Sequence, residues 1–225
     1  LILGRLDRVV IGELLSGRSR PLDAIGSSIG SWRHAAMAQP DPIQAYDRFE
    51  QAYLMQHYAS AKPTVPEITE VALWLMQTLL GDEGERHVAE HPWLRSHIVT
   101  ARGRGLNGRQ PGKRLIAGMG MAALGNAVSR RTLPASFQRV VFASSSAEPL
   151  TPLFDGFGTR YIDLAENNVF NALMASGAIP YVFEGVYDIE GAGKGAFWDG
   201  GIIDYHFDLK RLPDDQIWLY PHFNS

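Results

Sequence analysis

The feature that most constrains this chain is a five-residue turn, Gly26-Ser27-Ser28-Ile29-Gly30, set between two different patterns. A short apolar run at residues 21–25 precedes the turn and suits a buried strand. Residues 31–39 follow it, are rich in alanine and predict a helix. Glycines on both sides permit a sharp strand-to-helix turn without Cβ clashes, and such a turn exposes the Oγ of its central serine. Ser28 is therefore a candidate nucleophile.

The same turn places a backbone donor beside that serine. The N–H of Ile29 would lie at the start of the helix, where developing negative charge is stabilised. Ile29 is thus a candidate oxyanion donor, with Gly26 and Gly30 shaping the turn. An ordinary turn rich in glycine and serine is the alternative, and the flanking strand and helix favour the functional interpretation.

A serine hydroxyl is a weak nucleophile and needs a base nearby. Asp199 is followed by Gly200 and Gly201, so its carboxylate can lie at a tight, accessible turn. Because Asp-Gly is also a common turn pair, this motif by itself assigns no role.

A histidine base is the second possibility. In α/β-hydrolases the partners follow the nucleophile in the order Asp or Glu, then His. Only His206 and His222 come late enough to follow Asp199 or Asp204. Such enzymes place the nucleophile after several strands, whereas only one strand is expected before Ser28. The histidine base stays open as an alternative.

The rest of the chain alternates between helical and strand patterns. Further helices are expected at 1–16, 42–58, 66–80, 82–90, 114–128 and 168–176, and further strands at 94–101, 138–143, 181–183 and 216–220. This alternation predicts one α/β domain over residues 1–225, with a mostly parallel sheet covered by helices on both faces.

Three segments together resemble the patatin-like phospholipase family. They are the early G-x-S-x-G at 26–30, an A-S-x-A-I-P segment at 175–180 and the late D-G-G at 199–201. The resemblance implies a three-layer α/β/α fold and a Ser–Asp dyad without histidine. Ser28 would attack the ester and Asp199 would take its proton. The implied substrates are phospholipids, lysophospholipids or other lipid esters.

The chain departs from the family pattern in one respect. Family members carry a glycine-rich oxyanion loop ahead of the first helix, and upstream of Ser28 this chain has only Gly4, Gly12 and Gly17. Leu1 falls about where that loop should end, so we expect the loop to precede Leu1. A non-catalytic lipid-binding domain of the same fold is a further alternative.

Composition excludes several classes of function. The formal net charge of −3 gives no general attraction to nucleic acid. The absence of cysteine excludes disulfides, thiolate metal sites and a cysteine nucleophile, and is compatible with the cytoplasm, where we expect the protein. We expect no cofactor and no metal, and interpret His87, His91 and His97 as surface residues.

A basic stretch adds one candidate contact with lipid. Its members are separated by no acidic residue: Arg102, Arg104, Arg109, Lys113 and Arg114. They could hold a lipid phosphate or touch an anionic membrane surface, so peripheral membrane contact is one hypothesis. A solvated loop is the alternative. No run of 18 apolar residues predicts a transmembrane helix.

Overall fold

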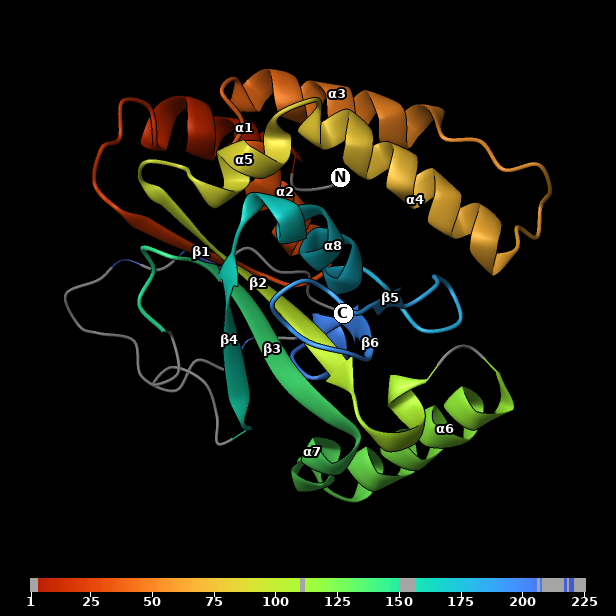
Figure 1. The fold of residues 1–225 in the computed structure, drawn as a ribbon. Coiled ribbons are helices and arrows are strands. Elements are labelled where there is room, and N and C mark those ends of the chain that lie inside the picture. Colours follow the sequence, from red (N-terminus) through yellow and green to blue (C-terminus); the bar gives the residue numbers. More distant parts are fainter. Residues whose placement is uncertain are drawn as a thin grey trace.

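The computed structural model describes residues 4–109, 112–149 and 157–205, together with positions 207, 217, 219 and 220. Within these residues a six-stranded sheet forms the middle of the molecule (Figure 1). Its strands are β1 (Leu22–Gly26), β2 (Leu94–Gly103), β3 (Phe137–Ser144), β4 (Thr159–Leu164), β5 (Val186–Tyr187) and β6 (Ala196–Asp199). The strand order is β4-β3-β2-β6-β5, and β1 also pairs with β2.

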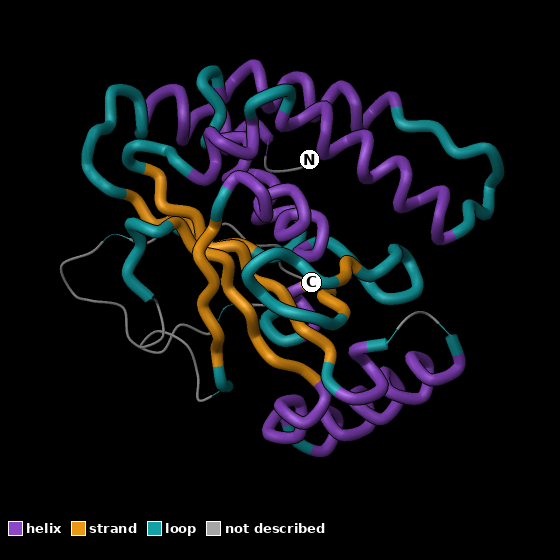
Figure 2. Tube along the Cα trace, viewed as in Figure 1, coloured by secondary structure: helices purple, strands orange, loops and turns teal. Residues whose placement is uncertain are grey.

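Helices cover both faces of the sheet (Figure 2). They are α1 (Gly4–Val9), α2 (Ile29–Met37), α3 (Pro42–Met55), α4 (Val65–Leu80), α5 (Gly84–Ala89), α6 (Lys113–Val128), α7 (Leu133–Ser136) and α8 (Glu166–Ser176). A π-helical turn, Val10–Leu14, continues α1. Helices α2 to α5 and α8 share a core with one face of the sheet, while α6 and α7 pack against the other. The predicted three-layer α/β/α architecture is therefore confirmed.

Local signals explain where the long helices begin. The Asp41 carboxylate accepts a hydrogen bond from the Gln44 N–H at 2.9 Å and Pro42 follows it, so α3 starts with a side-chain cap. Helix α4 starts with a capping box, in which Thr64 and Glu67 each satisfy the other's backbone N–H.

The sheet is mixed, and this corrects the expectation of a mostly parallel one. Pairs β1–β2 and β3–β4 are parallel, whereas β2–β3, β2–β6 and β5–β6 are antiparallel. Helices α6 and α7 lie at the end of the sheet where β2 stops (Figure 1), so the chain re-enters as β3 from that end and runs antiparallel. Strands β5 and β6 form a hairpin, which is antiparallel by necessity.

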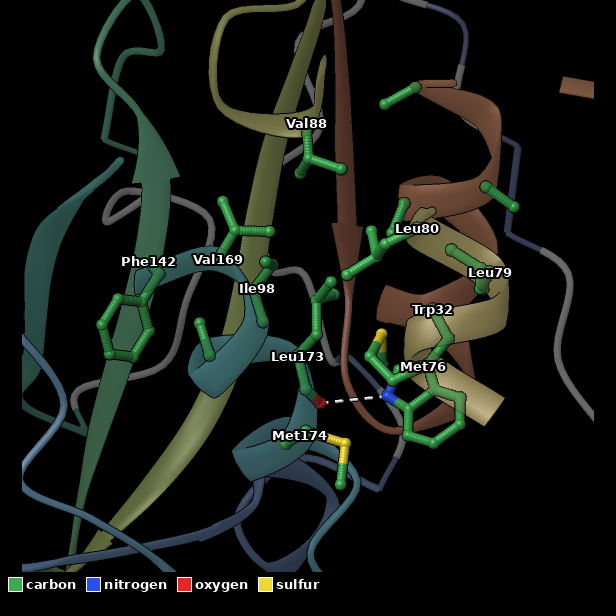
Figure 3. Packing of buried hydrophobic residues seen from close by; sticks show 14 of the residues in the cluster. Trp32, Met76, Leu79, Leu80, Val88, Ile98, Phe142, Val169, Leu173 and Met174 are labelled. Carbon is green, nitrogen blue, oxygen red and sulfur yellow. Dashed lines mark hydrogen bonds between the residues drawn. The ribbon is translucent and has the colours of Figure 1, made fainter. Parts of the chain in front are cut away.

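The largest core lies between the sheet and helices α2 to α5 and α8 (Figure 3). Ile98 of β2 and Phe142 of β3 are fully buried there. Within this core the indole N–H of Trp32 donates to the Leu173 carbonyl at 3.0 Å, as buried tryptophans usually require. That bond ties α2, the helix after the glycine-serine turn, to α8.

A second core supports the opposite face. Leu115 of α6 and Leu133 of α7 pack against Ala101 of β2, Phe137 of β3 and Trp198 of β6. The Trp198 indole N–H donates to the Asn107 carbonyl at 2.9 Å. The strand that ends at Asp199 is therefore held from both sides.

Most predicted elements are confirmed within a few residues, and one strand prediction is wrong. Residues 181–183 form a turn with only an isolated bridge between Pro180 and Phe183. Proline removes a strand donor and Tyr181 has φ of 68°, so the aromatic and branched residues there do not extend a sheet. Of the expected strand at 216–220 the structure describes positions 217, 219 and 220, none of which lies in a strand. Strands β4, β5 and β6 were not anticipated.

Candidate active site

Strands β1 and β6 both pair with the same edge of β2, and their carboxyl ends point toward each other. Strand β1 runs parallel to β2 and its last residue, Gly26, pairs with Ile98. Strand β6 runs antiparallel to β2 and its last residue, Asp199, pairs with Thr100. The carboxyl ends of β1 and β6 therefore meet beside Val99. This meeting point brings the glycine-serine turn and the D-G-G segment together, although they lie far apart in sequence.

The turn after β1 holds Ser28 in a rare backbone conformation. Its φ of 54° and ψ of −136° lie outside the regions that residues with side chains prefer, at a cost of about 1–3 kcal/mol. The Ser28 N–H donates to both the carbonyl oxygen and the Oγ of Ser176, at 2.8 and 3.1 Å. Such strain is typical of a nucleophile on a strand-to-helix elbow.

The glycines around the site are not equivalent. A Cβ on Gly26 would lie 2.6 Å from the backbone of Gly30 and Ser31, so only glycine fits there. A Cβ on Gly200 would lie 2.5 Å from the Val99 carbonyl oxygen and 2.9 Å from the Ser27 Cβ. Gly30 has open space around its Cβ position. The expectation that both elbow glycines avoid a clash therefore holds for Gly26 alone.

Ile29 is the first residue of α2. Within the described part of the chain, no group accepts a hydrogen bond from its N–H. Because that amide lies at a helix N-terminus, beside Ser28, it can donate to an anionic oxygen on a ligand. The geometry thus agrees with the position expected for an oxyanion donor.

Asp199 lies beside the elbow in a largely dry environment. Its side chain is buried, and Oδ1 accepts a hydrogen bond from the Gly201 N–H at 2.7 Å. Burial raises the pKa of this carboxyl, and hydrogen bonds from the Gly201 N–H and the Ser28 hydroxyl partly oppose that rise. The candidate nucleophile and the candidate base therefore lie close enough for Ser28 to affect the pKa of Asp199.

A third segment links these two. The Asp199 N–H donates to the Ala178 carbonyl at 2.9 Å, and the Ser176 Oγ donates to the Val99 carbonyl at 2.8 Å. Ser176 therefore joins β2 to the Ser28 backbone and is itself fully buried. In the sequence, residues 175–180 served only as a family signature. No spacing rule could have assigned Ser176 this contact, because its partners lie more than 70 residues away.

A comparison with protein families agrees with this geometry. The model of the patatin-like phospholipases matches residues 10–206, a range that includes the elbow, residues 175–180 and the D-G-G segment. The chain belongs to this family. No curated protein and no solved structure gave a match. Membership supports lipid acyl hydrolysis as the general activity of this patatin-like chain.

Asp204 has a structural role near the patatin-like site. Its carboxylate is buried and receives two hydrogen bonds from the Arg139 guanidinium, both at 2.6 Å, and a third from Arg130 at 2.9 Å. These bonds attach the segment after the D-G-G turn to β3. Asp204 is therefore held in a structural contact with two arginines. His206 and His222 lie outside the described residues.

Other candidates occupy varied places in the patatin-like fold. His97 is fully buried and its Nε2 lies 2.9 Å from Asp23, so the expectation of a surface residue is wrong. Strand β2 is buried on both faces between residues 96 and 101, which explains the burial of His97. In the described part of the chain, no group of three His, Cys, Asp or Glu residues could hold a metal ion.

The basic stretch does not act as one loop. Arg102 lies over the Phe197 ring, and Arg104 donates to the Pro134 carbonyl at 2.6 Å. Arg109, Lys113 and Arg114 instead line a surface cleft of about 630 Å³ beside β5. Only the second group lines this cleft.

Proposed function

We propose that the protein hydrolyses carboxylic esters of lipids, with Ser28 as nucleophile and Asp199 as its base. The observation that supports the proposal is the meeting of β1 and β6 at Val99, which brings the turn that carries Ser28 beside Asp199. Burial raises the pKa of that carboxyl, so its anion binds a proton more readily than an exposed aspartate. Family membership supports the same general reaction.

The reaction runs in two halves. The Ser28 Oγ attacks the ester carbonyl carbon while its proton passes to Asp199, and the Ile29 N–H stabilises the oxyanion. The bond to the leaving alcohol breaks and Asp199 returns the proton to that oxygen, leaving an acyl-Ser28 ester. Water then attacks the acyl carbon while Asp199 takes a proton from the water. The bond between that carbon and the Ser28 Oγ breaks, Asp199 returns the proton to the Oγ, and the fatty acid is released.

The substrate class follows from the family rather than from a described pocket. We propose phospholipids, lysophospholipids or other lipid esters, and Asp199 needs no cofactor in this scheme. One observation bears on the histidine alternative: the Asp204 carboxylate is already hydrogen-bonded to Arg139 and Arg130, which favours a structural role for it.

Labelling with a fluorophosphonate probe tests the proposal. The probe should modify Ser28, as shown by peptide mapping, and Ser28→Ala should abolish labelling. Ser27→Ala is the matched control, because Ser27 is the neighbouring serine of the same turn and should leave labelling intact. Asp199→Asn should slow labelling strongly, whereas His206→Ala and His222→Ala should not.

Each contrary result has a definite meaning. Absence of labelling on the folded wild-type protein would favour the non-catalytic lipid-binding alternative. Loss of labelling in either histidine variant, with the fold retained, would favour a histidine base instead of Asp199. Labelling at another serine would exclude Ser28 as the nucleophile.

A further inference from the structure

Four large apolar side chains of helix α6 face away from the protein. Its buried positions are Leu115, Gly118 and Ala122, two of them small. Its large apolar side chains on the outer surface are 58–87 % exposed, and they are Ile116, Met121, Leu124 and Val128. A helix of a globular protein usually turns its apolar stripe toward the core, so this arrangement leaves an unpartnered apolar face.

Close contacts on the inner side explain why the helix is not rotated. A Cβ on Gly118 would lie 2.4 Å from the Asn107 Oδ1, and a Cβ on Gly125 would lie 2.7 Å from the Thr132 Oγ1. Larger residues therefore do not fit at positions 118 and 125 of α6. The outward apolar face, called the α6 face below and made by Ile116, Met121, Leu124 and Val128, is a consequence of this packing.

Both ends of the α6 face carry exposed cations. Residues 91–147 contain nine Lys and Arg residues and no Asp or Glu. Three of these arginines pair with Asp23 or Asp204, and Asp188 lines the cleft beside Lys113. Lys113 and Arg114 begin the helix, Arg131 follows it, and all three are exposed. Within the described part of the chain, none of the three forms an ion pair. The helix thus combines an apolar face with cations at both ends.

A second apolar surface lies elsewhere and differs in charge. Leu54 and Met55, at the end of α3, are 71–76 % exposed. Next to them Glu67 and Glu70 line a cleft of about 500 Å³ together with Trp74. Helices α3 and α4 lie on the opposite side of the sheet from α6 (Figure 1). An anionic partner would be repelled there and attracted to α6.

We propose that the protein docks on an anionic lipid membrane through the α6 face. Ile116, Leu124 and their neighbours would enter the headgroup region, while Lys113 and Arg114 would contact lipid phosphates. None of the described helices is long and apolar enough to cross a membrane, so α6 would lie along the surface. A second copy of the chain fits the α6 face less well, because a two-fold contact would bring the cations of the two copies close together and they would repel each other.

Docking would deepen the proposed function, on which this step rests, by bringing the lipid ester to the enzyme. Leu115 of α6 shares a core with Trp198, the residue before Asp199. The docking helix and the strand that ends at the proposed base therefore form one packed unit. Membrane binding itself needs no catalysis and can be measured separately.

Vesicle flotation with the full-length Ser28→Ala protein tests the docking proposal without lipid turnover. The protein should float with vesicles of phosphatidylcholine and phosphatidylglycerol, but not with phosphatidylcholine alone, and binding should weaken as salt is raised. Lys113→Gln with Arg114→Gln should weaken binding by about 30-fold. Leu124→Gln with Val128→Gln should weaken it by about tenfold or more.

Leu54→Gln with Met55→Gln is the matched control, since it removes similar apolar area beside acidic residues and should leave binding unchanged. Equal loss in both apolar pairs, or no binding of the parent to anionic vesicles, would overturn the proposal. So would an α6-dependent dimer, detected by sedimentation.

Hydrolysis of a water-soluble ester by the same variants, made with Ser28 intact, should stay unchanged. A failure of that reaction in the wild type would count against the proposed chemistry and not against docking.

Discussion

The two halves of the candidate site place their strain differently. The half formed by β1, the elbow and α2 carries its strain in the backbone, where Ser28 has φ of 54°. The half formed by β6 and the D-G-G turn has Asp199 at an ordinary φ of −50°, and its unfavourable energy comes from burying a carboxylate. One half costs conformational energy and the other costs solvation energy.

The difference extends to the response of each half to pH. The elbow half contains His34 on α2, and burial lowers the pKa of that imidazole to about 3, with further lowering from His97 and Arg33. The other half contains Asp199, and burial raises the pKa of its carboxyl. Acid therefore destabilises the first half, whereas ionisation of Asp199 destabilises the second. Each half therefore buries a titratable group whose charged form would lower stability.

The largest expected effect is on activity, where the two halves should behave as one. Ser28→Ala and Asp199→Asn should each lower ester hydrolysis by about 10⁴-fold, and the double variant should lose no more than either single variant. Steady-state kinetics with purified, folded proteins measures this. In the wild type, kcat/KM should fall on acidification with a midpoint above the pKa of an ordinary aspartate, because burial raises that of Asp199. If the losses of activity in the double variant were additive, Ser28 and Asp199 would not act together as a dyad.

The next largest effect separates the two glycines of the elbow. Gly26→Ala forces a Cβ against backbone atoms at 2.6 Å and should lower the free energy of unfolding by about 3 kcal/mol. Gly30→Ala, in open space at a helix position, should change it by less than about 1 kcal/mol. Urea unfolding of both variants measures the difference. Equal losses of the free energy of unfolding in the two variants would contradict the predicted difference between Gly26 and Gly30.

The acid response of the elbow half is expected to be smaller. An unfolded histidine binds a proton below about pH 6.5, whereas folded His34 stays neutral to about pH 3. The unfolded state therefore binds more protons, and His34 should cost the fold about 2 kcal/mol between pH 7 and pH 5. His34→Leu should remove that loss, and His57→Leu, at an exposed position, should retain it. Denaturant unfolding at the two pH values decides between them.

The smallest effect compares the stability cost of each active residue. Ser28→Gly should raise the free energy of unfolding by about 1 kcal/mol or less, because glycine adopts the positive φ freely but loses more chain entropy. Asp199→Asn should also raise it at neutral pH, by removing a buried charge. For Asp199 the folded pKa is raised, so its destabilisation is present above that pKa and disappears as pH falls below the unfolded value. A lower melting temperature in Asp199→Asn would contradict this.

Much of the local structure was predictable from the sequence. The elbow between β1 and α2, the caps of α3 and α4, and strands β2 and β3 follow from patterns spanning a few residues. The turn at 181–183 was mistaken for a strand because aromatic and branched residues favour strands, while Pro180 and the positive φ of Tyr181 favour the turn. Buried His97 was mistaken for a surface residue because its partner Asp23 lies on another strand.

By itself the sequence determined the chemistry on offer: a serine on a strand-to-helix turn, an aspartate before two glycines, and no thiol. Tertiary structure decided how these groups meet. Strand register on β2 sets Gly26 and Asp199 on either side of Val99, and Ser176 bridges them from α8. It also decided that four large apolar side chains of α6 face outward, because Asn107 and Thr132 leave room only for glycine at positions 118 and 125. Short-range patterns cannot encode such contacts, since each depends on packing between residues distant in the chain.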